Sequence, residues 1–178
     1  NKIEWSPLAR LRHLIVDSND EDFVNLIQDN IRLENFIDYY LFSNYISGID
    51  NISKNILLIR QNQLEPLQII PFDFDDAFSI VDVILDHNRL YKRLIELNPN
   101  DFKDQLKLRW FYLRENDFTA EKFIDLVEEN IEELQSSDII YIENNKWNSS
   151  IELSNLSENL EQWMINRLVI LDAYYSEI

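Results

Sequence analysis

Apolar residues recur every three to four positions through most of the chain, which is the spacing that predicts amphipathic α-helices. In the first third of the sequence such patterns cover residues 7–15, 21–28 and 33–47. The third pattern is apolar on nearly all sides. Because a helix without a polar face is stable only when it is covered, we expect 33–47 to be the buried centre of the fold. Gly48 follows this helix, and we expect a left-handed residue there to end it.

The pattern changes to short β-type runs after this helix. Residues 55–60 and 67–71 are rich in Ile and Leu, and they flank a polar loop, 61–66, that ends in Pro. This arrangement predicts a small β-hairpin with a long loop. The second run leads directly into 72–78, Phe-Asp-Phe-Asp-Asp-Ala-Phe, which we interpret as an acidic and aromatic turn.

Helical spacing returns in the second half of the chain. It predicts helices over 85–97, 101–114 and 119–134, and a final helix that Ser157 caps. Thr119 is the predicted N-cap of the third of these helices. Residues 136–156 are polar and rich in Asn, which indicates a loop with room for a short helix. The predicted fold class is therefore mainly α with a small β-hairpin, in a single domain that spans 1–178.

Composition narrows the classes of function. The chain has 33 Asp and Glu against 16 Lys and Arg, a formal net charge of −17. Nucleic-acid binding needs a basic surface that displaces counterions from phosphates, so we expect no nucleic-acid partner. A single Gly excludes a glycine-rich phosphate loop, and the lack of Cys excludes thiolate metal sites. No apolar run approaches the roughly 20 residues of a membrane span, so we expect no membrane insertion.

Candidate chemistry lies between the central helix and the acidic turn. Asp50 and Asn55 have the D-x-x-x-x-N spacing of a kinase catalytic loop. In that chemistry the Asp accepts the proton of the attacking hydroxyl, and the Asn binds magnesium. A second magnesium-binding carboxylate is needed after the hairpin, where the chain has Asp73, Asp75 and Asp76.

The spacing alone is not specific, because it also occurs at 20–25 and 125–130 within helical patterns. The setting distinguishes Asp50. A buried helix ends at Gly48, the Asp follows in a predicted loop, and Asn55 opens a strand. A purely structural interpretation stays open, in which Asp50 is a solvated loop residue and the acidic turn caps the next helix.

The sequence resembles the CotH (spore coat protein H) kinase family in four segments, 37–44, 48–50, 55–59 and 70–78. The family is usually written with an N-x-D…N segment followed by a Pro-Trp-Asp-Phe-Asp block. Gly48 stands where this pattern has its first Asn, and Phe72 stands where it has Trp. The resemblance implies an atypical protein-kinase-like fold, of which this chain is similar to the large, C-terminal lobe.

The resemblance also implies a function, which is ATP-dependent transfer of phosphate to Ser or Thr of partner proteins, with magnesium or manganese. Asp50 matches the catalytic Asp of the family, and Asn55 matches its metal-binding Asn. Asp73 matches the metal-binding Asp, with Asp75 as the alternative. Lys54, next to Asn55, is a candidate for contact with a phosphate of ATP, and a solvated loop lysine is the other interpretation. Family proteins include secreted, cell-surface and spore-coat proteins, so we expect one of these locations.

In the family, a Lys that grips ATP and its Glu partner lie upstream in a small N-terminal lobe. No such pair is found here, because Lys2 and Glu4 are too close together and in the wrong context. We therefore expect a large-lobe portion that does not transfer phosphate by itself. A non-catalytic helical binding module of a surface or coat protein is the alternative from another class. A structural domain of a carbohydrate-associated secreted protein is a third.

Overall fold

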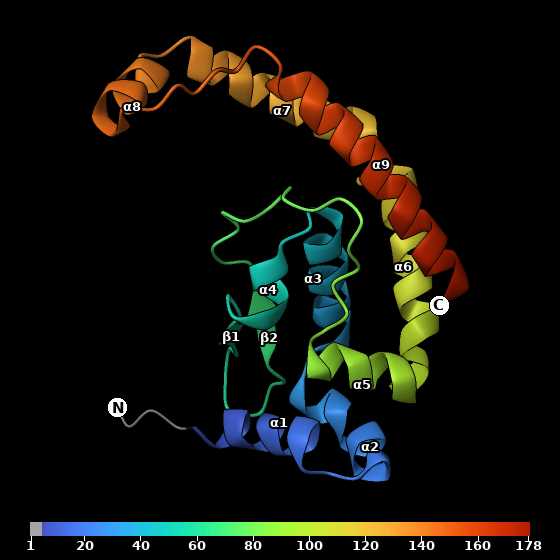
Figure 1. The fold of residues 1–178 in the computed structure, drawn as a ribbon. Helices are drawn as coiled ribbons and strands as arrows, with labels where there is room; N and C mark the ends of the chain where they lie inside the picture. The colour runs from blue at the N-terminus through green and yellow to red at the C-terminus, as the bar shows by residue number, and fades with distance from the viewer. Residues whose placement is uncertain (1–4) are drawn as a thin grey trace.

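A computed structural model describes residues 5–178, so Lys2 and Glu4 lie outside the described residues. The chain folds mainly into helices with one small hairpin (Figure 1), which confirms the predicted class. The elements are α1 (Ser6–Val16), α2 (Asp20–Asn30), α3 (Leu33–Tyr45), α4 (Ile49–Ser53), β1 (Leu57–Ile59), β2 (Gln68–Ile70), α5 (Arg89–Leu97), the 3-10 turn η1 (Pro99–Asp101), α6 (Phe102–Asn116), α7 (Ala120–Gln135), α8 (Ile139–Trp147) and α9 (Leu156–Glu177).

Helix α3 is the buried centre of the fold, as its pattern predicts. Nine of its thirteen residues are buried. In Figure 1 it stands between the hairpin with α4 on one side and α6 with α9 on the other. Tyr40 packs against Tyr91 of α5 with ring centroids 4.5 Å apart, and the Tyr91 hydroxyl donates to the Phe36 carbonyl oxygen at 3.0 Å. The core is thus built around α3 by aromatic contacts from distant parts of the chain.

The hairpin is attached to α3 through its second strand. Strands β1 and β2 pair antiparallel, as predicted, with Leu58 opposite Ile69. The Ile69 N–H donates to the side-chain oxygen of Asn35 at 2.7 Å, and the Asn35 amide donates to the Ile69 carbonyl oxygen at 3.1 Å. This two-way contact satisfies the outer edge of β2, which has no further strand beside it. It also fixes the point at which the chain enters the acidic turn.

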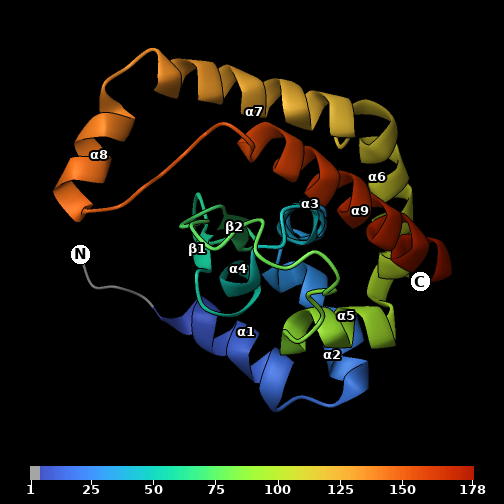
Figure 2. The ribbon, with the colours of Figure 1, turned by 45° about the horizontal axis from the view of Figure 1, so that its top comes forward.

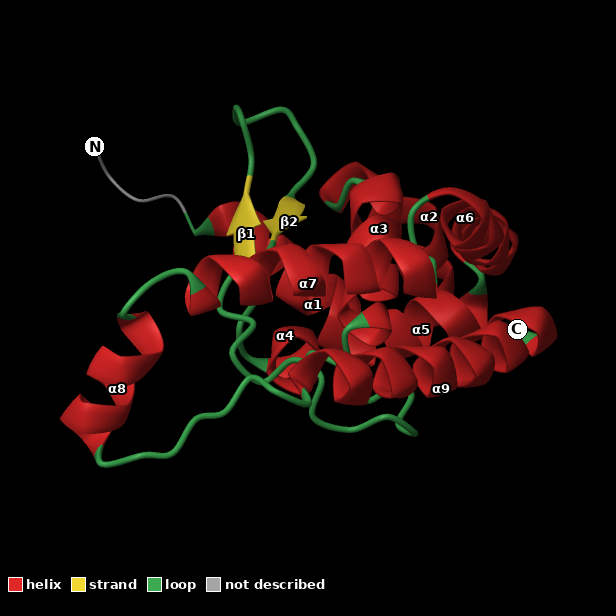
Figure 3. Ribbon diagram, turned by 90° about the horizontal axis from the view of Figure 1, so that it is seen from above, coloured by secondary structure: helices red, strands yellow, loops and turns green. Residues whose placement is uncertain are grey.

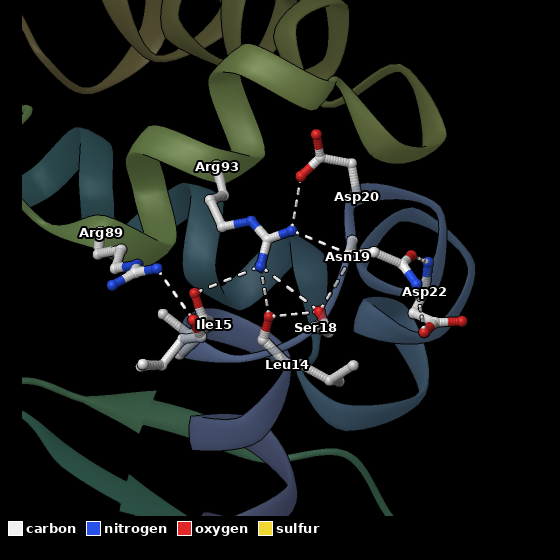
Figure 4. Close-up of polar contacts among 9 residues, drawn as sticks. Leu14, Ile15, Ser18, Asn19, Asp20, Asp22, Arg89 and Arg93 are labelled. Carbon is white, nitrogen blue, oxygen red and sulfur yellow. Dashed lines mark hydrogen bonds and ion pairs between the residues drawn. The ribbon is translucent and has the colours of Figure 1, made fainter.

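Two arginines of α5 hold the corner between α1 and α2. Figure 4 shows the Arg93 guanidinium, which donates to the Leu14 carbonyl oxygen at 2.6 Å and to the Asp20 carboxylate at 2.8 Å. Arg89 donates to the Val16 carbonyl oxygen at 3.0 Å. The last carbonyls of a helix lack partners within the helix, so these cationic donors stabilise the C-terminal end of α1.

Helices α7 and α8 form an arm that extends beyond the body of the fold. Helix α7 lies alongside α9, and α8 lies at the C-terminal end of α7 (Figure 2). Figure 3 shows α8 standing apart from the hairpin and from the other helices. No residue of α8 is buried. Among the described residues, no helix combines the length and the apolar composition that crossing a bilayer requires.

The start of α5 differs from the sequence prediction. The helix predicted over 85–97 begins only at Arg89, and Asn88 is its N-cap, with its side chain accepting the Leu90 N–H at 2.8 Å. Leu85 is instead held in an extended segment, where its N–H donates to the buried Asn44 side chain of α3. A tertiary hydrogen bond from a distant helix thus replaces the first turn that local spacing predicts.

Two predicted helix ends are wrong and one is confirmed. Helix α9 begins at Leu156, so Ser157 lies in its first turn and its hydroxyl donates to Glu128 of α7 at 3.2 Å. After α3 the left-handed residue is Ser47, with φ 54°, whereas Gly48 has φ −75°. Thr119 is the N-cap of α7, as predicted, and accepts the N–H of the third residue after it.

Six of the eight tyrosines have raised pKa values because burial disfavours the phenolate. They are Tyr39, Tyr40, Tyr45, Tyr91, Tyr174 and Tyr175. For Tyr45 the pKa rises to about 12. The neutral hydroxyl is therefore part of the packed core, and ionisation opposes folding.

Truncation of α3 should be costly. We expect Phe36→Ala and Leu41→Ala each to lower the free energy of unfolding by about 2–5 kcal/mol, since both side chains are at most 2% exposed. Urea unfolding followed by circular dichroism measures this loss. Glu34→Ala in the same helix is the control, because Glu34 is exposed and should change the value little. Equal effects in all three variants would show that α3 is peripheral.

Stability should fall as the pH rises through the window between about 10 and 12. In this window the unfolded tyrosines, with pKa near 10, have lost their protons while the folded ones, such as Tyr45 at about 12, retain theirs. The unfolded state then binds fewer protons, so the free energy of unfolding decreases with pH. Melting temperatures across this window test the sign, and Tyr45→Phe should reduce the slope. A melting temperature that stays level would contradict the assignment.

Candidate functional site

The candidate site lies at the C-terminal end of α3, where α4 meets the turn that follows β2 (Figure 1). The sequence predicted that Asp50 lies in a loop. In the structure it is instead the second residue of the short helix α4. The Lys54 N–H donates to the Asp50 carbonyl oxygen at 2.8 Å, which closes the helical turn. The turn places the Lys54 side chain on the same face as the Asp50 carboxylate.

Lys54 and Asp50 form an ion pair with 2.6 Å between Nζ and Oδ2. The hydrogen bond to Asp50, and then its charge, raise the pKa of Lys54, with smaller contributions from the charges of Asp76 and Asp75. The Lys54 side chain is 67% exposed, and that of Asp50 is 32% exposed. The pair therefore holds the Asp50 carboxylate in place while the ammonium remains open to an incoming anion.

Two asparagine amides fix the backbone of the acidic turn. The Asn55 side chain donates to the Asp73 carbonyl oxygen at 2.9 Å. The buried Asn51 side chain donates to the same oxygen at 3.2 Å and to the Phe72 carbonyl oxygen at 2.8 Å. Behind them, the Tyr39 hydroxyl donates to the Asn51 carbonyl oxygen at 2.9 Å. The structure thus brings two of the predicted metal-binding residues, Asn55 and Asp73, into direct contact.

Asp73 has a left-handed backbone, with φ 57°. Few residues other than Gly adopt this region, and Asp and Asn are among those that tolerate it. Its carbonyl oxygen is held by the two amides, whereas its side chain is exposed. A rigid backbone with an outward carboxylate is a suitable arrangement for binding a cation from solvent.

The other two acids of the turn have different surroundings. Asp76 accepts the Asp50 N–H through Oδ2 at 2.7 Å, so it supplies a partner to the first turn of α4. Its Oδ1 is buried and has no hydrogen-bond partner among the described residues. Asp75 is exposed and lies close enough to Lys54 to affect its pKa. The turn and α4 are therefore joined at two points, through Asp76 and through Asn55.

Gly48 is required by a close approach rather than by its backbone angles. A Cβ at this position would lie 2.7 Å from the Asn51 side-chain oxygen and 3.2 Å from a ring carbon of Phe74. The Asn that the family pattern has here would therefore displace Asn51 or the Phe74 ring. Gly48 allows the buried Asn51 side chain to reach the acidic turn.

Arg167 of α9 fastens the segment that follows the turn. It is fully buried, and its guanidinium donates to the carbonyl oxygens of Asn44 at 2.8 Å, Val81 at 2.8 Å and Val83 at 2.6 Å. Burial lowers its pKa to about 10. Three carbonyl contacts take the place of a carboxylate partner, and they tie the end of α3 to residues 81–83.

Sequence reasoning did not assign a site role to Asn51, and it offered Asp76 only as one of three acids that could bind magnesium, not as the partner of the Asp50 N–H. Asn51 was detectable only as an amide next to Asp50, and its burial depends on the helical state of α4. Asp76 was visible as the third acid of the turn, but no spacing rule separates an acid that caps a helix from one that faces solvent. Both roles depend on contacts between segments more than twenty residues apart.

The oxygen donors of the site suit magnesium held together with phosphate. In the described part of the chain, no group of three or more His, Asp or Glu side chains has the arrangement of a metal site. Magnesium is usually bound through one or two protein oxygens, with substrate phosphates and water completing its octahedron. The exposed Asp73 carboxylate and the neighbouring Asn55 amide meet this requirement, and Asp75 offers a second carboxylate. The residues present therefore fit a nucleotide-bound magnesium ion.

A family model described as CotH kinase protein matches residues 1–171, nearly the whole chain. No curated protein and no solved structure gives a significant match. The matched range contains both segments that meet in the candidate site, α4 and the acidic turn. The chain therefore belongs to the CotH kinase family.

Proposed function

We propose that this chain is the large lobe of a protein kinase that transfers phosphate from ATP to a Ser or Thr hydroxyl of a partner protein. The main support is the junction between α4 and the acidic turn. There the hydrogen bond from Asn55 to the Asp73 backbone, and that from the Asp50 N–H to Asp76, hold together the residues that phosphotransfer requires. Membership of the CotH kinase family supports the same chemistry.

Asp50 acts in this proposal as the base that orients the acceptor hydroxyl and takes its proton. Lys54, at 2.6 Å, holds the carboxylate in position through its positive charge. The same ammonium is exposed, so it is also the group that contacts a phosphate of ATP. Positioning and charge neutralisation account for most of the catalysis of phosphoryl transfer, and this pair contributes to both.

Asp73 and Asn55 are the proposed metal-binding residues. When bound, magnesium neutralises charge on the phosphates of ATP, and manganese accepts the same oxygen ligands. We favour Asp73 over Asp75 because two asparagine amides fix its backbone before any ligand arrives. A fixed backbone reduces the entropy that Asp73 loses on binding, whereas no such amide contact is found for Asp75 among the described residues.

We infer that these 178 residues alone bind Mg-ATP weakly and transfer no phosphate. A kinase grips the nucleotide from both lobes, and the sequence has no upstream Lys and Glu of the kind that the small lobe provides. Activity in the proposal therefore requires a small lobe in addition to these residues. Its location, by analogy with the family, is secreted, on the cell surface or in a spore coat.

A non-catalytic binding module remains the second candidate, and one observation favours it. Helix α8 has no buried residue, although it contains Ile139, Tyr141, Ile142 and Trp147, which are all exposed. An exposed apolar helix is typical of a protein-binding surface. This surface is compatible with a kinase that docks its partner, so the two candidates differ only in whether phosphate is transferred.

Transfer by the protein that supplies both lobes should depend on Asp50 and Asp73. We expect Asp50→Asn to reduce kcat by about 10²–10⁴-fold, since the general base is lost. Asp73→Asn should affect both kcat and the apparent affinity for ATP. Radiolabelled phosphate transfer with magnesium, and then manganese, measures both effects. Asp82→Asn is the control, because this exposed acid lies outside the junction. Equal labelling by wild type and both site variants would disprove the assigned roles.

Nucleotide-dependent metal binding should separate Asp73 from Asp75. We expect Asp73→Asn to weaken Mn²⁺ binding in the presence of ATP by roughly ten-fold or more, and Asp75→Asn to weaken it less than about three-fold. Asn keeps the left-handed backbone of residue 73 accessible, so this variant tests the charge and not the fold. Titration of free Mn²⁺ by electron paramagnetic resonance gives the affinities. The reverse order would assign the metal to Asp75.

A further inference from the structure

An apolar groove of about 610 Å³ lies between the acidic turn, α7 and α9. Its lining is almost entirely aliphatic and aromatic, and it includes Phe42, Phe74, Phe78, Leu126, Ile131 and Leu160. Leu126, in the middle of α7, is 60% exposed although it is surrounded by apolar neighbours. A groove of this size exceeds what scattered surface apolar residues explain.

The groove continues toward the tip of the arm. A second hollow, of about 290 Å³, shares Leu134 with the first and reaches Ile140 of α8. Beyond it, the exposed aromatic residues Tyr141 and Trp147 extend the apolar surface along α8. The views in Figures 2 and 3 agree that α8 is not covered by the body of the fold. The apolar groove therefore leads toward α8 through a hollow of mixed polarity, whose lining also includes Gln135, Ser137 and Ser154.

The negative charge of the chain is concentrated around this surface. Residues 71–88 and 119–165 together contain 16 acidic and two basic residues, a net charge of −14. The remaining 113 residues contain 17 acidic and 14 basic residues, a net charge of only −3. The acidic residues of these two segments, which contain the acidic turn, the arm and the start of α9, thus form an acidic border around an apolar floor, while the rest of the molecule is nearly neutral.

The acids of α7 are available to a partner. Glu129, Glu132 and Glu133 are exposed, and within the described part of the chain none of them forms an ion pair or a hydrogen bond through its side chain. Glu128 accepts only the Ser157 hydroxyl. Unpaired like charges on one helix repel one another, and a cationic partner relieves that repulsion.

We propose that this groove and the arm bind an amphipathic cationic segment of a partner protein. Its apolar side chains enter the groove between the acidic turn and α7, and its Lys and Arg side chains lie against the acidic border. Contact between apolar side chains provides the affinity. The opposite charges increase the rate of association and determine which partners bind. A second copy of this chain would place like charges together, as would an anionic membrane.

This binding requires no nucleotide, so it does not depend on the proposed phosphotransfer. The acidic turn forms one wall of the groove and also carries Asp73. A segment bound in the groove therefore lies beside the candidate site, whether it is modified there or only held. Asp50→Asn should leave binding unchanged, which keeps the two proposals separately testable.

The probe is a fluorescent Leu/Lys peptide of about 18 residues, or five helical turns, with all leucines on one face. A Leu/Glu twin and a scrambled Leu/Lys peptide with no apolar face are the comparisons. In fluorescence anisotropy without nucleotide, we expect the Leu/Lys peptide to bind roughly ten-fold or more tightly than the scrambled one, and the Leu/Glu twin not to bind. Equal binding of the Leu/Lys and scrambled peptides would overturn the proposal, and so would binding of the Leu/Glu twin.

Matched variants locate the interaction. Leu126→Ser should weaken peptide binding by roughly five-fold or more, whereas Val169→Ser on α9 should not, since Val169 is similarly exposed but lies outside the groove. No difference between the two variants would overturn the proposal. Sedimentation gives a second test. A dimer that Leu126→Ser abolishes would also overturn the proposal, because a second copy would then cover the groove.

The charges are tested by changing Glu129, Glu132 and Glu133 together to Gln. This triple variant should bind the Leu/Lys peptide more weakly and with a smaller dependence on salt. The control neutralises three exposed acids elsewhere, in Asp29→Asn, Asp104→Asn and Glu115→Gln. It changes the net charge equally, so an equal effect of both triple variants would show that only overall charge matters and would overturn the assignment of the border.

Discussion

A helix that is apolar on all sides is shielded from water only if other elements cover every face. Helix α3 is such a helix, so the rest of the chain must pack around it. The elements that cover it follow it in the sequence and include β2, α6 and α9. Because these elements all pack against α3, the loops that connect them come together at its C-terminal end. The candidate site occupies this point, so its geometry follows from the burial of the helix.

Polar groups at the end of α3 are satisfied by distant residues rather than by neighbours. The Asn44 side chain accepts the Leu85 N–H, and the Asn44 carbonyl oxygen accepts the Arg167 guanidinium. Buried carbonyls and amides are costly when unpaired, so these bonds fix the path of residues 81–85. The acidic turn is thereby held from both sides, by asparagines before it and by arginine after it. Such support explains how Asp73 maintains a left-handed backbone.

Spacing of apolar residues was sufficient to predict α1, α3, α7 and the hairpin, because in these segments local periodicity and tertiary burial agree. It failed at the start of α5. Local spacing assigns Leu85 to the helix, but in the structure the Leu85 N–H donates to the Asn44 side chain instead. It also placed Asp50 in a loop, since a five-residue helix has too few positions to show a period. Spacing and setting pointed to Asp50 and Asn55, and the resemblance to the family favoured Asp73 over Asp75, whereas Asn51 and Asp76 act through contacts that only the folded chain reveals.

The net negative charge is concentrated in residues 71–88 and 119–165, which include the acidic turn and the arm. Self-repulsion among fourteen net negative charges on 65 residues opposes compaction of these segments. The hydrogen bond to Asp50 and the charge of Asp50 raise the pKa of Lys54, and Asp76 and Asp75 of the turn add smaller contributions, so the candidate site carries a paired cation within an acidic field. A magnesium ion and a cationic partner both reduce this field, and each therefore weakens binding of the other. The metal-binding carboxylates and the docking groove share one turn, so we expect occupation of one to be coupled to occupation of the other through its charge.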